Sequence, residues 1–232
     1  MTRQDYLNEL LEQYEVVEEL SRKGTSCILL LRHKELQEEL VLRSTARRIP
    51  IADYLKTVVF QYLPEVYDAV HLTDGDVILE EALKGKTLEE ILDGRNLSFR
   101  EARDILFCVA DALTIIHEAG YVHRDIKPKN IMMAENGDVK LFDFDASRAA
   151  IGTDDTVRLG TVGFAAPEQF IGSSDRRADI FALGVLLNVM LTGKHPSETL
   201  PKNRRARRIV KKATAMNPEE RFDSAEEFRK AL

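Results

Sequence analysis

The chain concentrates its most reactive side chains in one short stretch, residues 121–145. Within it, Asn136-Gly137 lies between two apolar runs, a pattern that predicts a β-hairpin with a two-residue type I′ turn. That turn would place Asn130 directly opposite Asp143, because facing residues are equidistant from the turn. An amide oxygen and a carboxylate would then converge at the open end of the hairpin. Hard oxygen donors, few in number, suit a Mg²⁺ ion that keeps waters and is shared with substrate phosphates.

Two further reactive side chains, Asp125 and Lys127, lie in the loop that leads into this hairpin. Residues 123–130 (His-Arg-Asp-Ile-Lys-Pro-Lys-Asn), followed by residues 143–145 (Asp-Phe-Asp), resemble the catalytic loop and metal-binding motif of serine/threonine protein kinases. The resemblance implies that Asp125 accepts or orients the proton of a substrate hydroxyl and that Lys127 steadies the transferring phosphoryl group. The implied Mg²⁺ ligands are Asn130 and Asp143. The alternative interpretation is a surface hairpin with solvated carboxylates.

Residues 20–28 occupy the place of the family's glycine-rich phosphate loop. Glycines in such a loop let backbone amides approach phosphate oxygens with no Cβ in the way. Here only Gly24 remains, and a plain polar hairpin is an equally good interpretation of this segment taken alone. The residues that the resemblance assigns to ATP are Ser21, Lys23, Gly24, Ser26, Ile28, Arg43, Glu81 and Leu83.

Arg43 aligns with the strand lysine that pairs the α- and β-phosphates in the family. Arginine keeps the charge but has a longer, planar head, so the exchange is not conservative at a packed phosphate site. The glutamate that a helix usually supplies as its partner is not evident, and Asp53 is the nearest acidic candidate. The alternative for Arg43 is a solvated strand charge. Residues 78–85 resemble the hinge of protein kinases, which would place Glu80 at the gatekeeper position. By that resemblance the carbonyl of Glu81 and the amide of Leu83 would bond the adenine edge; the alternative is a strand followed by a helix cap.

Residues 160–168 resemble the end of a protein kinase activation segment. By that analogy Thr161 would bridge Asp125 and Lys127. The segment favours a protein substrate, because small-molecule phosphotransferases that share the metal hairpin generally lack it. The alternative without a function is a glycine- and proline-containing turn before a helix. Two further structural roles follow from the resemblance: Glu168 would pair with Arg221, and Asp179 would hold the backbone of the catalytic loop.

Arg124 precedes Asp125, and in the family an arginine at this position commonly receives a phosphorylated activation segment. Thr153 and Thr156 lie in the polar loop that would carry the phosphate. A phosphate there could order the loop through charge-assisted hydrogen bonds. Autophosphorylation at one of the two threonines is therefore expected.

The elements needed to position these residues change character near residue 85. Capping boxes begin three helices after that point, at Thr87 with Glu90, at Ser98 with Glu101 and at Ser224 with Glu227. An α+β fold is expected, similar to the two-lobed protein kinase architecture: a small antiparallel β-sheet N-lobe over residues 1–84 and a mainly helical C-lobe over residues 85–232. The expected elements of the first lobe are a helix over residues 6–14, strands over 15–20, 28–32, 39–42, 66–71 and 77–80, and a segment over 51–63 that is helical at best.

The amino-acid composition is that of an ordinary globular protein: of the 232 residues, 44% are hydrophobic and 31% are charged. The net charge of −6 argues against nucleic acid as a partner of the whole chain. Cys27 and Cys108 lie far apart in the sequence and belong to no disulfide or zinc-binding motif, which fits a reducing compartment. No run approaches the ~18 apolar residues of a membrane span, so a cytoplasmic protein with no membrane contact in this chain is expected, although an anchor beyond its last residue would remain compatible.

A basic run extends from Lys202 to Lys212. Such a run on a helix is usually a solvated face, and the competing interpretation is a docking patch for an acidic partner.

Three functions compete at this stage. The first is a serine/threonine kinase that transfers the γ-phosphate of ATP to a protein hydroxyl. The second is a pseudokinase that binds nucleotide or partners, motivated by Arg43, by the degenerate glycine loop and by Asp145 in place of the family's glycine. The third is a small-molecule phosphotransferase, which residues 160–168 disfavour.

Overall fold

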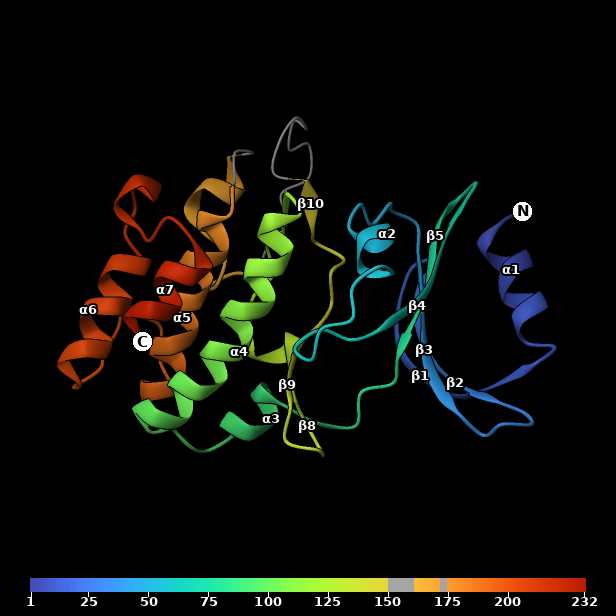
Figure 1. Ribbon diagram of the computed structural model, residues 1–232, viewed down its shortest axis with the longest axis horizontal. Helices are drawn as coiled ribbons and strands as arrows, with labels where there is room; N and C mark the ends of the chain where they lie inside the picture. Colours follow the sequence, from blue (N-terminus) through green and yellow to red (C-terminus); the bar gives the residue numbers. More distant parts are fainter. Residues whose placement is uncertain (150–160, 172–174) are drawn as a thin grey trace. The chain divides into compact units, whose positions relative to one another are not determined.

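The computed structural model describes residues 1–149, 161–171 and 175–232 (Figure 1). The chain divides into two compact units. Unit 1 comprises Met1–Phe60 and Pro64–Lys84, and unit 2 comprises Gln61–Leu63 and Gly85–Leu232. Thr153 and Thr156, the expected phosphorylation sites, lie outside the described residues.

Unit 1 is built on a five-stranded antiparallel sheet in the order β1-β2-β3-β5-β4. Strand β2 alternates buried and half-buried residues, as a sheet with two unlike faces requires. All five expected strands are present, and the first is longer than expected because it pairs up to Lys23. Their bounds are β1 Tyr14–Lys23, β2 Ser26–His33, β3 Glu39–Thr45, β4 Val66–Leu72 and β5 Gly75–Glu81.

Helix α1, Arg3–Leu10, packs its apolar side on one face of this sheet, against a buried cluster that includes Leu29, Leu42 and Leu79. The expected bounds of 6–14 were wrong at both ends. The helix begins earlier because Thr2 caps it in a capping box with Asp5. It ends earlier because the chain has to enter β1 at Tyr14.

Arg3, at the first position of α1, is buried and joins three parts of unit 1. Its guanidinium donates to the carbonyl oxygen of Thr25 (3.0 Å) in the β1–β2 turn and to Ser44 Oγ (3.2 Å) on β3. Its backbone N–H donates to Asp74 Oδ1 (2.8 Å) in the β4–β5 turn. The helix is thereby attached to the sheet by polar as well as apolar contacts.

Helix α2 is a single turn, Ala52–Leu55. The segment expected to be helical over residues 51–63 is therefore mostly irregular. Thr57, Val58 and Val59 follow soon after this turn, beyond Lys56, and β-branched side chains lose rotamer freedom in a helix.

Unit 2 contains five helices among its described residues, arranged as a packed bundle (Figure 1). α4 packs against α5 and α7, and α6 packs on α5. The helices are α3 Leu88–Leu92, α4 Phe99–Glu118, α5 Arg177–Thr192, α6 Arg204–Ala213 and α7 Ala225–Ala231. The short strands are β6 Gly85–Thr87, β7 Tyr121–Val122, β8 Ile131–Ala134, β9 Val139–Leu141 and β10 Arg148–Ala149, and the 3₁₀ turns are η1 Pro128–Asn130, η2 Pro167–Phe170 and η3 Pro218–Glu220.

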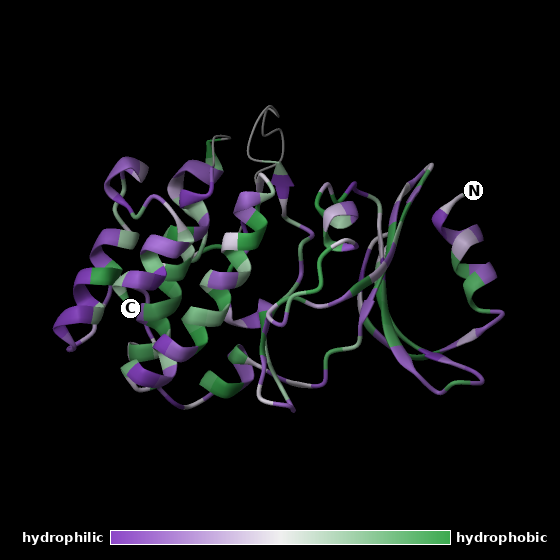
Figure 2. Ribbon diagram, in the orientation of Figure 1, coloured by the Kyte–Doolittle hydropathy of each residue, from purple (hydrophilic) through white to green (hydrophobic). Residues whose placement is uncertain are grey.

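The apolar helix α5 forms the centre of the bundle, and nearly all of its residues are buried. Figure 2 shows it largely green, whereas α6 is largely purple. Gly184 allows α6 to approach closely, since a Cβ on it would lie 2.6 Å from Cβ of Ala213. This central helix carries Asp179, whose role is described below.

The predicted helix starts of unit 2 are largely confirmed. Thr87 and Ser98 each form the full capping box. At α7 only half of the box is present: Ser224 accepts from the N–H of Glu227, but Glu227 accepts from Asp223 instead of Ser224.

The predicted register of the β8–β9 hairpin was wrong by one residue. Ile131 pairs with Leu141 and Met133 with Val139, so the connection has a three-residue loop. Its turn closes through the N–H of Gly137, which donates to Ala134, with Gly137 at φ +91°. This is a turn followed by a residue in the left-handed region, the commonest three-residue hairpin loop. No helix among the described residues is long and apolar enough to cross a membrane.

Candidate active site

The carboxylate of Asp125 is the centre of a compact polar cluster in unit 2. Lys127 Nζ donates to Asp125 Oδ2 at 2.7 Å, and Thr161 Oγ1 donates to Oδ1 at 2.7 Å. Lys127 also donates to Thr161 at 2.9 Å, which closes a triangle of the three side chains. The bridging position expected of Thr161 is the position that the structure gives it.

Asn130 completes the cluster. Its Nδ2 donates to Asp125 Oδ2 (3.0 Å) and to the backbone oxygen of Asp125 (2.9 Å). Asn130 lies on η1, a turn that begins at Pro128 and brings the amide back over the loop. Because the amide nitrogen is committed to Asp125, its oxygen is directed to the opposite side and is available as a ligand.

The charge on Asp125 is favoured by these contacts. Burial by itself would raise the pKa of this carboxyl, but the hydrogen bonds from Lys127 and Thr161 outweigh burial and lower the pKa. Asp125 is therefore ionised throughout the neutral range.

The loop that carries Asp125 is held from below by Asp179 of α5. Asp179 is fully buried and accepts hydrogen bonds from the backbone N–H of His123 (2.9 Å) and of Arg124 (2.7 Å). His117 of α4 contacts the same carboxylate at 2.8 Å. Asp179 thus holds the backbone at the place expected from the sequence.

Arg124 adopts φ +70°, a conformation that is costly for a residue with a side chain. Its N–H is fixed by Asp179, and its carbonyl oxygen accepts a hydrogen bond from Gln169 Nε2 at 3.0 Å. Gln169, which is buried, was missed in the sequence. The signal for it was weak, because a single polar residue in a turn does not show which backbone it will contact.

Glu168 and Arg221 form a bidentate ion pair, with distances of 2.5 and 2.8 Å. Arg221 is buried, lies over the ring of Phe181 and also donates to Ala215. The expected pair is therefore present, and it fixes residues 167–170 to the bundle. Thr161, seven residues before Glu168, is thereby held close to the loop that carries Asp125.

Asp143 lies one residue beyond the position opposite Asn130. The N–H of Phe142 donates to the backbone oxygen of Asn130 at 3.1 Å, so Phe142 faces Asn130. Asp143 itself adopts φ +67°, which turns the chain away from the β9 direction. The predicted direct pairing of Asn130 with Asp143 was wrong, because the hairpin loop has three residues instead of two. The two residues nevertheless remain at the same end of the hairpin.

A pocket of about 550 Å³ opens beside Lys127 and Thr161. Its lining includes three carboxylates of α3 and the following turn, and Glu90 among them already accepts hydrogen bonds from Thr87. The pocket residues are Glu89, Glu90, Leu92, Asp93, Gly94, Lys127, Pro128, Thr161, Phe164 and Val189.

In unit 1, Arg43 has a buried acidic partner, Glu80. The Nη2 atom of Arg43 lies 3.2 Å from Oε1 of Glu80, and the two residues are only 5% and 7% exposed. Arg43 is therefore not a solvated strand charge. The suggestion of Asp53 as its partner is corrected as well, because the acid placed against Arg43 is Glu80 and Asp53 contacts His71 at 2.9 Å.

Two of the residues assigned to ATP, Ile28 and Arg43, share one face of the sheet with Glu80. Ile28 is opposite Arg43, and Arg43 is opposite Ile78, two residues before Glu80. Because side chains alternate along a strand, Ile28, Arg43 and Glu80 lie on the same face, and α1 packs on the other.

The segment in the place of the phosphate loop is a tight hairpin. Lys23 pairs with Ser26, leaving only Gly24 and Thr25 in the turn, and Ser21 pairs with Ile28. Gly24 has φ +59° at the first turn position, where a type II′ turn requires a positive φ. Ser26 Oγ accepts from the N–H of Ala46 at 3.1 Å. Glu81 and Leu83 lie at and just after the end of β5, and their contact with adenine remains a prediction.

The sequence matches the protein kinase domain family over residues 16–231. The chain belongs to the protein kinase family. The serine/threonine-protein kinase PknB of Mycolicibacterium smegmatis is 31% identical over 269 aligned residues, which cover 96% of this chain and 43% of that protein. PknL of Mycobacterium tuberculosis is 38% identical over 139 residues, covering 58% of this chain and 35% of that protein.

A vertebrate protein kinase is similar as well: the maternal embryonic leucine zipper kinase of Danio rerio is 29% identical over 207 residues, covering 83% of this chain and 31% of that protein. The chain thus spans less than half the length of each of these relatives. Protein kinases in general use ATP and a divalent metal. The matches give no support to the pseudokinase alternative.

Proposed function

We propose that this protein kinase domain transfers the γ-phosphate of ATP to a serine or threonine hydroxyl of a protein. The observation that carries the proposal is the convergence of Lys127, Thr161 and Asn130 on the one carboxylate of Asp125. The cluster holds a carboxylate, a cation and an amide side chain in fixed positions next to one another. Such positioning is most of what phosphoryl transfer requires of a protein.

Each residue of the cluster has a distinct task in this proposal. Asp125 accepts the hydrogen bond of the substrate hydroxyl and orients its oxygen, and its lowered pKa keeps it ionised. Lys127 lies between Asp125 and Thr161 and places a positive charge where the transferred group passes. Thr161 fixes both, so that neither has to reorganise during the reaction.

The donor set at the end of the hairpin fits a magnesium ion. Asn130 contributes an amide oxygen and Asp143 a carboxylate, and Mg²⁺ is usually bound by one or two such protein ligands with waters and phosphates. When bound, Mg-ATP would supply the phosphoryl group and neutralise charge on its β- and γ-oxygens. The fixed amide of Asn130 supports this assignment, because the Asp125 contacts occupy its nitrogen and direct its oxygen away from Asp125.

On unit 1, Arg43 would contact the phosphates in place of the family's lysine. Its permanent positive charge and planar fork of donors suit phosphate oxygens. Ile28 on the same face would contact the nucleotide base or sugar, and the tight turn at Gly24 would lie close to the phosphates.

The pocket beside Lys127 suggests which proteins are phosphorylated. Glu89 and Asp93 are carboxylates in its lining, and the hydroxyl to be phosphorylated has to approach Asp125 next to it. Such a site favours lysine or arginine residues near the acceptor serine or threonine.

Intact-mass spectrometry of the purified chain, incubated with and without Mg-ATP, tests the proposal and requires no identified substrate. Mass increments of phosphate are expected, together with transfer of radiolabelled phosphate to a generic basic protein. Asp125→Asn should lower the rate by about 10²- to 10⁴-fold, the usual contribution of a positioned base. Glu135→Gln, an exposed carboxylate change on the same hairpin, is the matched control and should leave the rate unchanged.

Nucleotide binding measured in parallel separates the alternatives. Binding of Mg-ATP with no transfer to itself or to any protein would favour the pseudokinase. Equal rates for the parent and Asp125→Asn would contradict the role of Asp125 directly.

A further inference from the structure

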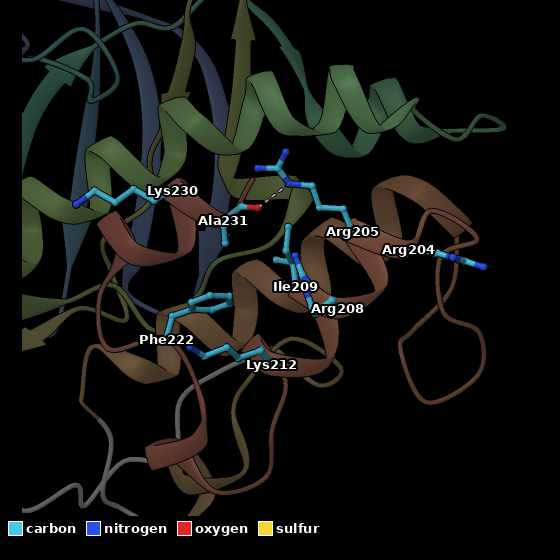
Figure 3. Close-up of a pocket in the computed structure, with 8 residues that line it drawn as sticks. All are labelled: Arg204, Arg205, Arg208, Ile209, Lys212, Phe222, Lys230 and Ala231. Atoms are coloured by element: carbon cyan, nitrogen blue, oxygen red, sulfur yellow. Dashed lines mark hydrogen bonds between the residues drawn. The ribbon is translucent and has the colours of Figure 1, made fainter.

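A second pocket, of about 530 Å³, lies on unit 2 between α6 and α7 (Figure 3). None of the residues around Asp125 lines it. The ring of Phe222 and the buried side chain of Ile209 form its apolar part. The residues that line it are Arg204, Arg205, Arg208, Ile209, Lys212, Phe222, Lys230 and Ala231.

Five of these eight residues are cations, and none is an acid. Arg205 Nε donates to the backbone oxygen of Ala231 at 3.0 Å, a contact that orients the guanidinium without neutralising it. Lys212 Nζ lies 4.4 Å from the centre of the Phe222 ring. Figure 3 shows these two side chains next to each other. Of the five, Lys230 has an acidic neighbour, Glu226, at 2.7 Å on the exposed side of α7. The positive charge of the pocket is therefore largely uncompensated by the described residues that line it.

This charge opposes the stability of the helix that carries it. Arg204, Arg208 and Lys212 follow one another at intervals of four residues, and like charges at that spacing destabilise a helix. Arg204 and Arg205 also occupy the first turn, where the helix dipole disfavours positive charge. The whole chain has a net charge of −6, so these cations are concentrated here against the general composition. A solvent-exposed helix face with no ligand would not require cations at positions that destabilise the helix.

The chemistry of the pocket matches a phosphate group on a side chain. A phosphoserine or phosphothreonine carries nearly two negative charges and three acceptor oxygens, and guanidinium groups bond such oxygens in pairs. The hollow between two helices admits one protruding group, whereas a membrane surface or a nucleic acid backbone would favour a broad or extended track of cations. The apolar part beside the cations can hold the hydrocarbon portion of the residue that carries the phosphate.

We propose that the pocket between α6 and α7 binds a phosphorylated serine or threonine of a protein partner. This binding goes beyond the phosphoryl transfer proposed above and does not depend on it. Arg208 and Lys212 contact the phosphate, Arg205 is oriented toward it by Ala231, and Phe222 and Ile209 contact the side chain beneath it.

Fluorescence anisotropy with the full chain, in the absence of ATP, tests this site. The probe is a fluorescein-labelled peptide of glycine and alanine with a single phosphoserine. It is compared with the unphosphorylated peptide of the same sequence, called the serine twin below. The phosphopeptide is expected to bind at least about tenfold more tightly than the serine twin. The double variant Arg208→Glu with Lys212→Glu is expected to lose at least that preference. A matched variant, Lys202→Glu with Lys211→Glu, makes a comparable charge change at exposed lysines outside the lining and should retain it.

Circular dichroism of both double variants establishes that they are folded. Equal binding of the two peptides, or an equal loss in the two variants, would overturn the proposal, because either result means that binding follows overall charge. Binding only to vesicles of phosphatidylcholine and phosphatidylserine, with no phosphopeptide binding, would assign the surface to membranes and would overturn it too. Since no transfer reaction is measured, an inactive kinase would not affect the outcome.

Discussion

Arg43 and Glu80 form a buried ion pair across two neighbouring strands of one sheet, with 3.2 Å between Nη2 and Oε1. In the family to which this chain belongs, the basic residue on this strand is usually paired by a glutamate from a helix. Here the helix between β3 and β4 is the single turn α2, and β5 supplies an acidic partner, Glu80. Hydrogen bonds of the β3–β5 ladder fix the spacing of the two backbones, so the pair forms whenever the sheet forms.

The first prediction concerns the stability of this pair. Glu80→Gln should destabilise the fold by about 1–3 kcal/mol, because a buried guanidinium loses its charged partner. Arg43→Met combined with Glu80→Leu should recover much of the loss, since apolar side chains of similar volume can replace a buried ion pair. Urea denaturation followed by circular dichroism measures both. The single variants Arg43→Met and Glu80→Leu are measured as well. If the double variant loses as much stability as the two single variants together, the two residues do not act as a pair.

Magnesium binding is expected to depend on Asp143. Removing this carboxylate leaves the charge of the triphosphate uncompensated near a partly desolvated site, where electrostatic interactions are strong. Asp143→Asn should therefore abolish the part of the ATP-induced rise in melting temperature that requires Mg²⁺. Thermal shift measurements with ATP, with and without the metal, give the comparison. Equal stabilisation of parent and variant would remove Asp143 from the metal site.

Substrate preference should follow the carboxylates beside Lys127. Glu89→Gln combined with Asp93→Asn is expected to raise KM for peptides with arginine near the acceptor by a few-fold, because exposed ion pairs contribute about 0.2–1 kcal/mol each. The value of kcat should change little, since neither residue belongs to the cluster around Asp125. Steady-state kinetics with arginine-containing and arginine-free peptides measure the effect. An equal change of KM for both peptides would mean that these carboxylates do not select basic residues.

The stability of unit 1 should fall as the pH rises above about 6.5, the ordinary pKa of histidine. His71 contacts Asp53 through Nε2 and Asp76 through Nδ1, each at 2.9 Å, and these two hydrogen bonds raise its pKa. A group with a raised pKa in the folded state stabilises the fold below its unfolded value of about 6.5. That contribution is lost as the pH rises through the folded pKa.

Melting temperatures measured across this range should therefore decline in the parent and decline less in His71→Gln. His195→Gln is the control, because the ring of His195 contacts the hydroxyl of Ser197 instead of a carboxylate. Identical pH profiles for the parent and His71→Gln would show that the two carboxylates do not control this dependence.

The sequence was sufficient to predict those features of the fold that depend on residues close together in the chain. The capping boxes at Thr87 and Ser98 began helices as predicted, because both partners lie within one turn. The contacts of Thr161, Asp179 and Glu168 came from the family resemblance, and the structure places all three as that resemblance implied.

Features that depend on distant contacts could not be predicted in the same way. The partner of Arg43 is 37 residues away on a strand that becomes its neighbour only in the folded sheet. Gln169 contacts Arg124 across 45 residues. The predicted register of the hairpin was wrong for a local reason, because Asn-Gly suits both a two-residue turn and the three-residue loop found here. A difference of one residue in the loop changes every residue pair of the hairpin.

The attachment of Arg3 has a practical consequence for trimming this domain. The match to the kinase family begins at residue 16, and a fragment cut there would lose all of α1. Leu29, Leu42 and Leu79 would lose their apolar cover, and the Thr25 turn would lose the guanidinium that fixes it to Ser44. The boundary suggested by similarity and the boundary required for a stable fragment are therefore different, and expression from residue 1 is the sound choice for the experiments above.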